Sequence, residues 1–491
     1  MWRPLVIVPL ILLSLLGSSS AEVSRLNRLS ESPVVLPNVA NQSALQLGAS
    51  RVTAGYYKLA HTHEASMFYL YVKARASQPG KQPVVLWMTG GPGCSSELAF
   101  FYENGPYHIT EDLGLELSEY GWDVNNNMIY VDQPINTGFS YSEDDRDRIY
   151  NEKGVAADML DFLHAFFEAH PELEDNPLYI TGESYGGHYV PAVSYAIFKH
   201  NQNITSNTKI NLKGLAVGNG LTDPGIQYGA YADFALQNGL IGRTTRNGIK
   251  AVYPLCELGV NLCNSLNLDV VCLLALQFCQ DTQFGGVMLL NPGMNVYDIR
   301  KPCVGQLCYD FSRLDAYLAQ PDVRRALGVG DRRWTECNME VNAEMQGDWM
   351  KNYEPTLPPM LDAGIEVMIY AGVEDLICNW LGNYRWVNAL PWNGAKAWAA
   401  SDLRPWLVDG SVAGEVRQAQ GLTFVKVHGA GHMVPMDQPK NSLAMLESWI
   451  QKAPFNTSQP SPLTPAHEVS AWSKAFSQLT SRKAGLFPQA A

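Results

Sequence analysis

The clearest indication of the fold is the stretch Leu178–Gly186, which reads LYITGESYG. A short apolar run ends in the pattern Gly-x-Ser-x-Gly, and apolar residues then recur at helical spacing from Tyr189 to Ile197. Small residues on both sides of a serine permit a tight turn from a strand into a helix, which lifts the hydroxyl clear of the sheet. The stretch therefore predicts a nucleophile elbow with Ser184 at its tip.

Apolar runs of the same character lie on both sides of this stretch. Between the runs 128–131 and 178–180, the segment 154–170 carries apolar residues at three- and four-residue spacing, which predicts an amphipathic helix. Strand, helix and strand in succession form the βαβ unit of a parallel sheet. We therefore expect an α/β fold, with a mostly parallel central sheet and helices on both faces. Further strands are expected at 83–88, 365–370 and 422–427, and a last helix near 441–452.

The middle of the chain departs from this alternation. From about 225 to 350 the apolar period is less regular, and six cysteines cluster between Cys256 and Cys308. We interpret 225–350 as an insertion, or cap, that is stapled by disulfides. The two parts of the core are then expected at 51–224 and 351–455.

The two ends of the chain have the composition of processed or loosely held segments. Arg3 precedes an apolar run that ends in small residues, which predicts a signal peptide over 1–21. The alternative is a membrane anchor, but the run is short for a spanning helix, which needs about 20 residues. No later stretch predicts a membrane span. Residues 22–50 are expected to form a propeptide or mobile arm, and 456–491, rich in proline and serine, a flexible tail.

Composition and cysteine usage agree with an exported globular protein. The 491 residues are 46% hydrophobic and carry a net charge of -13, which argues against a nucleic-acid partner. An exported chain can keep disulfides, and an odd count of nine cysteines leaves at least one free thiol. We expect the secretory pathway, with a vacuole-like compartment and the extracellular space both open. Candidate glycosylation sites are Asn41, Asn203 and Asn456.

Two polar residues follow the late strands and complete a candidate catalytic set. A serine is a weak nucleophile unless a base, oriented by an acid, removes its proton. After a strand-to-helix elbow the expected chain order is serine, acid, histidine. Asp375 follows the strand 365–370, and His432 follows the strand 422–427. Because open α/β sheets place their sites at the carboxyl ends of strands, we expect both beside Ser184.

A glycine-rich segment follows the first long apolar strand. Residues 89–96 read TGGPGCSS. Backbone N–H groups of such a loop can approach a reacting carbonyl, as an oxyanion hole requires. A structural turn or a phosphate loop are the alternatives, although a P-loop would need a Gly-Lys-Ser/Thr ending that is absent here.

Six motifs in order resemble those of the serine carboxypeptidases, in particular the plant class III group related to yeast carboxypeptidase Y. The resemblance covers roughly residues 51 to 453 and implies an α/β-hydrolase fold that needs no cofactor and no metal. It also implies release of single C-terminal amino acids from peptides and proteins through an acyl-enzyme, favoured at acidic pH. The motifs are WMTGGPGCSSE, VDQPINTGFSYS, ITGESYGGHYVP, GNGLTDP, YAGVEDLICNWLGN and VHGAGHMVPMDQP.

The resemblance assigns roles to individual residues. Ser184 is implied as nucleophile, His432 as base and acid, and Asp375 as the orienting acid. The N–H groups of Gly91 and Tyr185 are implied as the oxyanion hole. Two adjacent carboxyls that face a substrate carboxylate must hold protons, so we expect affinity to weaken as pH rises toward neutrality. The residues implied to bind that carboxylate are Thr89, Gly90, Glu103 and Glu183.

The resemblance also implies a disulfide pattern, which spacing alone leaves open. Cys378 is then the free thiol. The implied pairs are Cys94–Cys337, Cys256–Cys279, Cys263–Cys272 and Cys303–Cys308.

Two other functions remain as alternatives. An acyltransferase uses the same triad with an acyl-glucose donor, and only the acceptor differs. A non-catalytic stabilising or binding protein is the second alternative, and it is disfavoured because no triad residue is lost. A homodimer is possible in this family.

Overall fold

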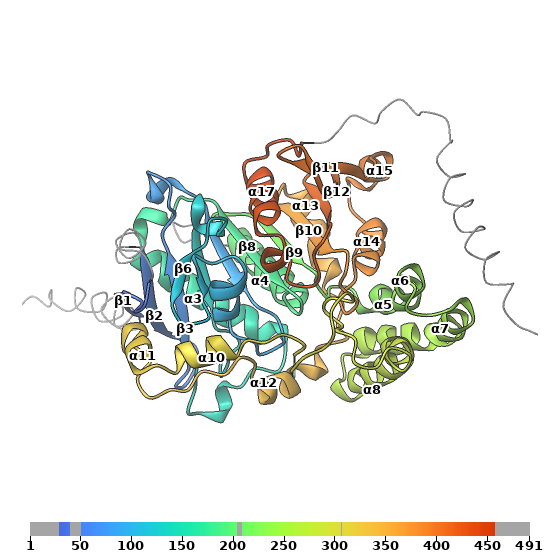
Figure 1. The fold of residues 1–491 in the computed structure, drawn as a ribbon, viewed down its shortest axis with the longest axis horizontal. Coiled ribbons are helices and arrows are strands. Elements are labelled where there is room, and N and C mark those ends of the chain that lie inside the picture. The colour runs from blue at the N-terminus through green and yellow to red at the C-terminus, as the bar shows by residue number, and fades with distance from the viewer. Residues whose placement is uncertain (1–28, 40–50, 204–208, 306, 457–491) are drawn as a thin grey trace, which may run out of the picture.

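The computed structural model describes residues 29–39, 51–203, 209–305 and 307–456 (Figure 1). The expected signal peptide, most of the expected arm, Asn41 and the tail beyond Asn456 lie outside these residues. Asn203 and Asn456 are both exposed, as glycan acceptors must be. Among the described helices, none combines the length and the apolar character needed to cross a membrane.

A mixed sheet runs through the described part of the chain. Its 11 strands lie in the order β1-β2-β3-β7-β4-β8-β9-β10-β13-β12-β11. The central strands from β7 to β13 pair in parallel, and the outer pairs are antiparallel. The strands are β1 (Leu29–Pro33), β2 (Val52–Lys58), β3 (Ser66–Val72), β4 (Val84–Met88), β7 (Asn127–Val131), β8 (Leu178–Glu183), β9 (Leu212–Gly218), β10 (Glu366–Gly372), β11 (Arg404–Val408), β12 (Ser411–Ala419) and β13 (Leu422–Val427). A separate hairpin pairs β5 (Tyr107–Ile109) with β6 (Leu115–Leu117).

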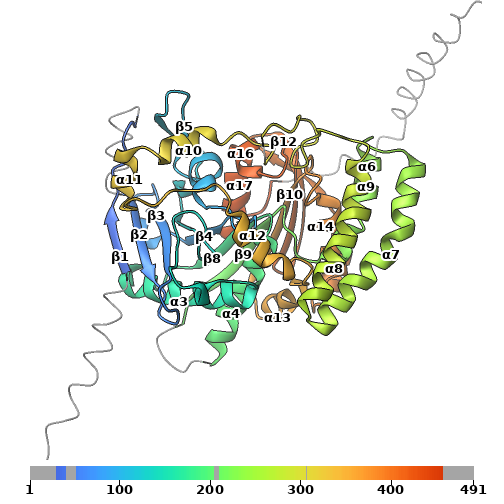
Figure 2. The ribbon, with the colours of Figure 1, turned by 90° about the horizontal axis from the view of Figure 1, so that it is seen from below.

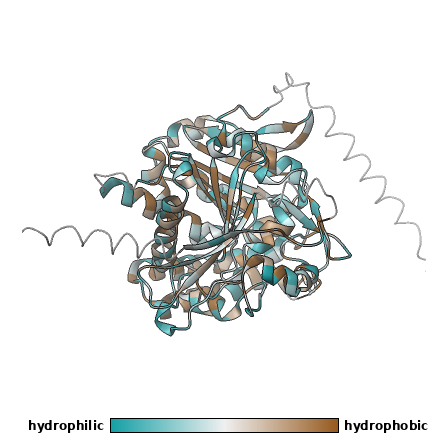
Figure 3. Ribbon diagram, turned by 90° about the vertical axis from the view of Figure 1, so that its left-hand side faces the viewer, coloured by the Kyte–Doolittle hydropathy of each residue, from teal (hydrophilic) through white to brown (hydrophobic). Residues whose placement is uncertain are grey.

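Successive residues of the central strands pack against opposite faces of the sheet. Leu86 and Ile369 join a core with α3 (Glu152–Ala169) and α4 (Gly186–Asn203). Their neighbours Trp87 and Tyr370 join the other core, with α17 (Pro439–Ile450). Both faces are covered in this way, as Figure 2 shows, and Figure 3 shows the hydrophobic residues gathered along the strands. The predicted α/β-hydrolase-type fold is therefore confirmed.

The chain between β9 and β10 is largely helical and lies beside the carboxyl ends of the strands (Figure 1). Long helices α7 and α8 pack together over a core of their own, which contains the buried cysteines of two disulfides. The helices of this region are α5 (Pro224–Tyr228), α6 (Tyr231–Gln237), α7 (Arg243–Leu266), α8 (Asp269–Cys279), α9 (Gly285–Met288), α10 (Ser312–Leu318), α11 (Pro321–Leu327) and α12 (Met339–Glu344). Those that follow in the core are α13 (Leu357–Asp362), α14 (Trp380–Ala389), α15 (Ala395–Ala400) and α16 (Val434–Asp437).

Part of the expected mobile arm is instead built into the sheet. Residues 29–33 form β1, which pairs antiparallel with β2, and Val34 and Leu36 are buried. The strand reads LSESP and has no apolar alternation, so the pattern gave no strand signal. A polar contact helps to hold β1 in place, because the Tyr69 hydroxyl donates a hydrogen bond to Glu31 at 2.7 Å.

Candidate active site

The nucleophile elbow forms as the sequence predicts. β8 ends at Glu183, α4 begins at Gly186, and Ser184 between them has φ +64°. A positive φ is strained for a side chain with a Cβ and costs of order 1–3 kcal/mol, so the surroundings must hold it. The Ser184 N–H donates to Gly218 O at 3.1 Å. A Cβ placed on Gly187 would lie 2.4 Å from Leu221 O, which explains the second glycine after the elbow.

His432 and Asp375 form a buried hydrogen-bonded pair. His432 Nδ1 lies 2.8 Å from Asp375 Oδ2, and Asp375 has no exposed surface. An ionised carboxylate only accepts, so Nδ1 carries the proton and Nε2 is left free to act as a base. Three further donors compensate the buried charge of Asp375: Asn219 Nδ2 at 2.8 Å and the N–H groups of Ile377 and Cys378 at 3.0 and 3.2 Å.

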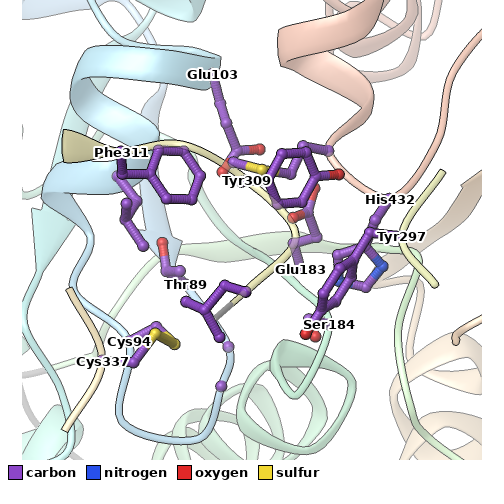
Figure 4. Close-up of a pocket in the computed structure, with 15 residues that line it drawn as sticks. Thr89, Cys94, Glu103, Glu183, Ser184, Tyr297, Tyr309, Phe311, Cys337 and His432 are labelled. Carbon is purple, nitrogen blue, oxygen red and sulfur yellow. A yellow bond between two sulfur atoms is a disulfide. The ribbon is translucent and has the colours of Figure 1, made fainter. Parts of the chain in front are cut away.

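The nucleophile and the histidine open into the same cavity (Figure 4). The cavity has about 520 Å³ of empty space, which includes space open to solvent. In Figure 4, Ser184 lies beside His432 and Tyr297, while the carboxyls of Glu103 and Glu183 come together above them. Apolar walls are supplied by Leu98, Leu307, Tyr309, Phe311 and Met433.

The glycine-rich segment packs directly against the elbow. A Cβ added to Gly90 would lie 2.5 Å from Tyr185 N and 2.8 Å from Ser184 Cβ, so only glycine permits this approach. Gly91 follows with φ +113°, a conformation that glycine adopts readily. Gly91 lines the cavity, and the neighbouring Gly90 lies directly against the backbone N of Tyr185, the other candidate oxyanion donor.

Glu103 and Glu183 meet in the wall of the cavity and share a hydrogen bond. Glu103 ends a π-helical turn, η2 (Ala99–Glu103), and Glu183 ends β8. Burial raises the pKa of Glu103 to about 8. Burial, followed by the charge of Glu103, raises the pKa of Glu183 well above its usual range. Protonated carboxyls are hydrogen-bond donors, so the pair presents an anion-binding surface at acidic and neutral pH.

Thr89 lies on the opposite side of the cavity from His432 (Figure 4). Its Oγ1 accepts a hydrogen bond from Trp87 Nε1 at 3.0 Å. The hydroxyl proton therefore remains available to a ligand.

The cysteine pairs in the structure are those that the resemblance implies. Cys94–Cys337 forms part of the cavity wall, and Cys303–Cys308 closes a short loop in the insertion. Cys256–Cys279 and Cys263–Cys272 join α7 to α8. The Cys378 thiol is free and buried, and burial raises its pKa well above the usual range, which makes it a poor nucleophile.

Several residues of the site had no role assigned from the sequence. Asn219 follows β9 in the motif GNGLTDP and holds Asp375, so its place after a strand was the available signal. Tyr297, Tyr309 and Phe311 come from irregular chain in the insertion, where no period indicates which side chains face the cavity. In the part of the chain that is described, no cluster of three or more histidine, cysteine or acidic residues suits a metal ion.

Comparison with known proteins places this geometry in a family. The profile of the serine carboxypeptidase family matches residues 44–452. A serine carboxypeptidase-like protein of Oryza sativa is 50% identical over 81% of this chain and 92% of its own length. Carboxypeptidase Y of Komagataella phaffii is 37% identical over 84% of this chain and 78% of its own.

A solved structure agrees with both relatives. The crystal structure of a prohormone-processing carboxypeptidase from Saccharomyces cerevisiae superimposes with a TM-score of 0.75 at 26% identity. It covers 86% of this chain and 94% of its own. The chain therefore belongs to the serine carboxypeptidase family and is a serine-type peptide hydrolase.

Proposed function

We propose that the enzyme releases one C-terminal residue at a time, with Ser184, His432 and Asp375 as the catalytic triad and the Glu103–Glu183 pair as the terminal-carboxylate site. The observation that carries this proposal is that Ser184, His432, Glu103 and Glu183 line one cavity, with Asp375 hydrogen-bonded to His432. An endopeptidase has no use for a protonated acid pair beside its nucleophile, whereas a free carboxylate needs such donors.

In the first half-reaction, Ser184 Oγ attacks the last peptide carbonyl carbon while His432 Nε2 takes the hydroxyl proton. The charge on the carbonyl oxygen is stabilised by the N–H groups of Gly91 and Tyr185. Asp375 keeps the imidazole in the required tautomer and stabilises its positive charge. The tetrahedral intermediate collapses, the C–N bond breaks, and His432 returns the proton to the leaving amino acid.

In the second half-reaction, water attacks the acyl-enzyme, with His432 again as base, and Ser184 is regenerated. The acid pair, Thr89 and Gly90 hold the terminal carboxylate of the substrate and so set the distance from chain end to scissile bond. This distance accounts for release of single residues.

An acyltransferase shares the path as far as the acyl-enzyme. A sugar leaving group carries no carboxylate, so Glu103 and Glu183 would have no anionic group to bind. The acid pair therefore favours peptide substrates over acyl-glucose donors. The disulfides agree with a compartment of the secretory pathway, such as a vacuole, and the raised pKa of Glu103 keeps that residue protonated at acidic and neutral pH.

The test is release of the C-terminal residue from N-blocked dipeptides between pH 4 and 8, with Ser184→Ala as control. We expect release that the variant lacks and that declines only as the pH rises toward and above about 8, where Glu103 ionises. Each dipeptide is paired with its C-terminal amide, which has the same side chains and no carboxylate. Equal turnover of acid and amide, or ester formation from an acyl-glucose donor without peptide release, would overturn the proposal.

A further inference from the structure

A second buried acid pair lies next to the glycine-rich segment. Glu97 and Asp132 are 2% and 1% exposed, and their carboxyls are hydrogen-bonded to each other. Asp132 also accepts from the N–H groups of Ser96 at 3.0 Å and Phe139 at 2.7 Å. Two backbone donors stabilise its negative charge, so Glu97 is the partner that holds the proton and donates.

Glu97 joins a third segment of chain to this pair. Its Oε2 accepts hydrogen bonds from the Ser95 hydroxyl and, at 3.3 Å, from Trp334 Nε1. Trp334 Nε1 also lies 2.8 Å from Ser95 Oγ. Burial and the charge of Asp132 raise the pKa of Glu97 well above its usual range, which agrees with a protonated side chain.

The hydroxyl of Ser96 anchors both ends of the glycine-rich segment. Ser96 Oγ donates to Val131 O at 2.7 Å and accepts from Thr89 N at 3.3 Å. Residues 89 and 96 are thereby held together, with Gly91 between them. The conformation of the segment thus depends on where Ser95 and Ser96 lie.

The chain around Trp334 holds the same segment from the outside. Ser95 N donates to Glu336 O at 2.9 Å, and Asn338 N donates to Gly93 O at 2.8 Å. The Cys94–Cys337 disulfide lies between these two contacts. The segment is therefore clamped between the end of β7 and the chain 334–338, and Glu97 is the side chain that bonds to both sides.

We propose that Glu97, acting with Asp132, is a positioning residue that holds the Gly90–Cys94 backbone in the orientation that aims the Gly91 N–H at the oxyanion. Glu97 does not touch the substrate and acts through Ser95 and Ser96. The inference rests on the proposed function, because it takes Gly91 as an oxyanion donor. Glu103 and Glu183 stand on η2 and β8, outside the Gly90–Cys94 backbone that Glu97 is proposed to hold.

Kinetics of Glu97 variants, normalised to active sites titrated with a serine-directed phosphonate, test this role. Loss of one complete oxyanion donor costs about 10²–10³ in kcat, so a misplaced donor in Glu97→Ala should cost about 10- to 100-fold. KM should change less than about threefold. Glu97→Gln keeps an N–H for Asp132 and an acceptor for Ser95, so its kcat should stay within about threefold of the wild type.

Two further variants keep the test decisive. Trp334→Phe keeps an aromatic six-membered ring but loses the indole N–H that bonds Ser95 and Glu97, and it should lower kcat several-fold if Glu97→Ala does not fold. Asp158→Ala is the matched control. It removes another buried acid, which lies on α3 and pairs with His61 at 2.9 Å, and it should lower stability without lowering kcat per titrated site.

The outcomes separate this inference from the proposed function. A wild-type enzyme without carboxypeptidase activity refutes the proposed function. An active wild type whose Glu97→Ala and Trp334→Phe variants keep their kcat per site, or change only in KM, refutes the positioning role. A loss of kcat in Glu97→Ala that Glu97→Gln does not share supports it.

Discussion

The pH dependence of carboxylate recognition follows from the pKa values of Glu103 and Glu183. Both pKa values are raised in the folded protein, that of Glu103 to about 8, so the pair is protonated below that pH. As pH rises through about 8 the pair gains a negative charge that opposes the substrate carboxylate. We expect kcat/KM to fall about tenfold per pH unit above this value. The burial of Glu103 thus moves the loss of affinity to higher pH than the sequence-based expectation.

Substitution of Glu103 measures how much this residue contributes to substrate binding. A hydrogen bond to a charged group contributes about 1.5–3 kcal/mol, so Glu103→Ala should raise KM about 10- to 150-fold at pH 5. Glu103→Gln keeps an N–H donor at every pH and leaves only Glu183 to titrate. Its KM at pH 5 should stay within a few-fold of the wild type, and its kcat/KM should fall less between pH 7 and 9.

The assay compares an N-blocked dipeptide with its C-terminal amide from pH 5 to 9.5. Any effect of pH on the triad is common to both substrates and cancels in the ratio of their kcat/KM values. The amide carries no charge, so only the acid should lose kcat/KM as the pair ionises. A ratio that stays constant across this range would show that Glu103 and Glu183 do not bind the terminal carboxylate.

Three further predictions concern the triad, the glycine-rich segment and stability. Asp375→Asn should lower kcat about 10⁴-fold with little change in KM, because the wrong imidazole tautomer is favoured, and a kcat within tenfold of the wild type would contradict this. Gly90→Ala should lower kcat at least about tenfold per titrated site, because its Cβ would lie 2.5 Å from Tyr185 N; unchanged kcat would place the oxyanion hole elsewhere. Buried carboxyls with raised pKa values, Glu97 and Glu152 among them, bind more protons folded than unfolded. Calorimetry should therefore show Tm decreasing from pH 5 to 8, and a Tm that rises over this range would mean that these groups are ionised when folded.

The elbow and the placement of Asp375 beside His432 could be predicted because local pattern and sheet topology agree. Gly-x-Ser-x-Gly specifies a turn that few other sequences permit, and Asp375 and His432 each follow a run with strand character. Parallel strands bring their carboxyl ends to one edge, so residues 57 positions apart in sequence form one hydrogen bond. The contact between Asp375 and His432 therefore follows from two local patterns, each of which places one residue at the end of a parallel strand.

Other features depend on partners that no local pattern reveals. The strand at 29–33 is polar, and it is recognised as a strand only from its backbone pairing with β2. Glu97 lies in the segment SSELAFF, where a lone acid before an apolar run looks like a solvated helix end. Its burial arises because Asp132 and Trp334, 35 and 237 positions away, provide its hydrogen bonds. Buried polar networks of this kind are specified by tertiary packing.

Both acid pairs make the enzyme sensitive to pH, one through substrate binding and the other through the structure next to the active site. Glu103 with Glu183 faces the cavity, Glu97 with Asp132 lies against the glycine-rich segment, and each pair keeps a proton only while the pH is below its raised pKa. A rise in pH therefore weakens substrate binding and charges a buried network next to the oxyanion donors. Variants that neutralise the first pair should change the pH profile of KM, whereas those that neutralise the second should change that of kcat. While the pH stays below these raised pKa values, substrate recognition and active-site geometry are both expected to be maintained.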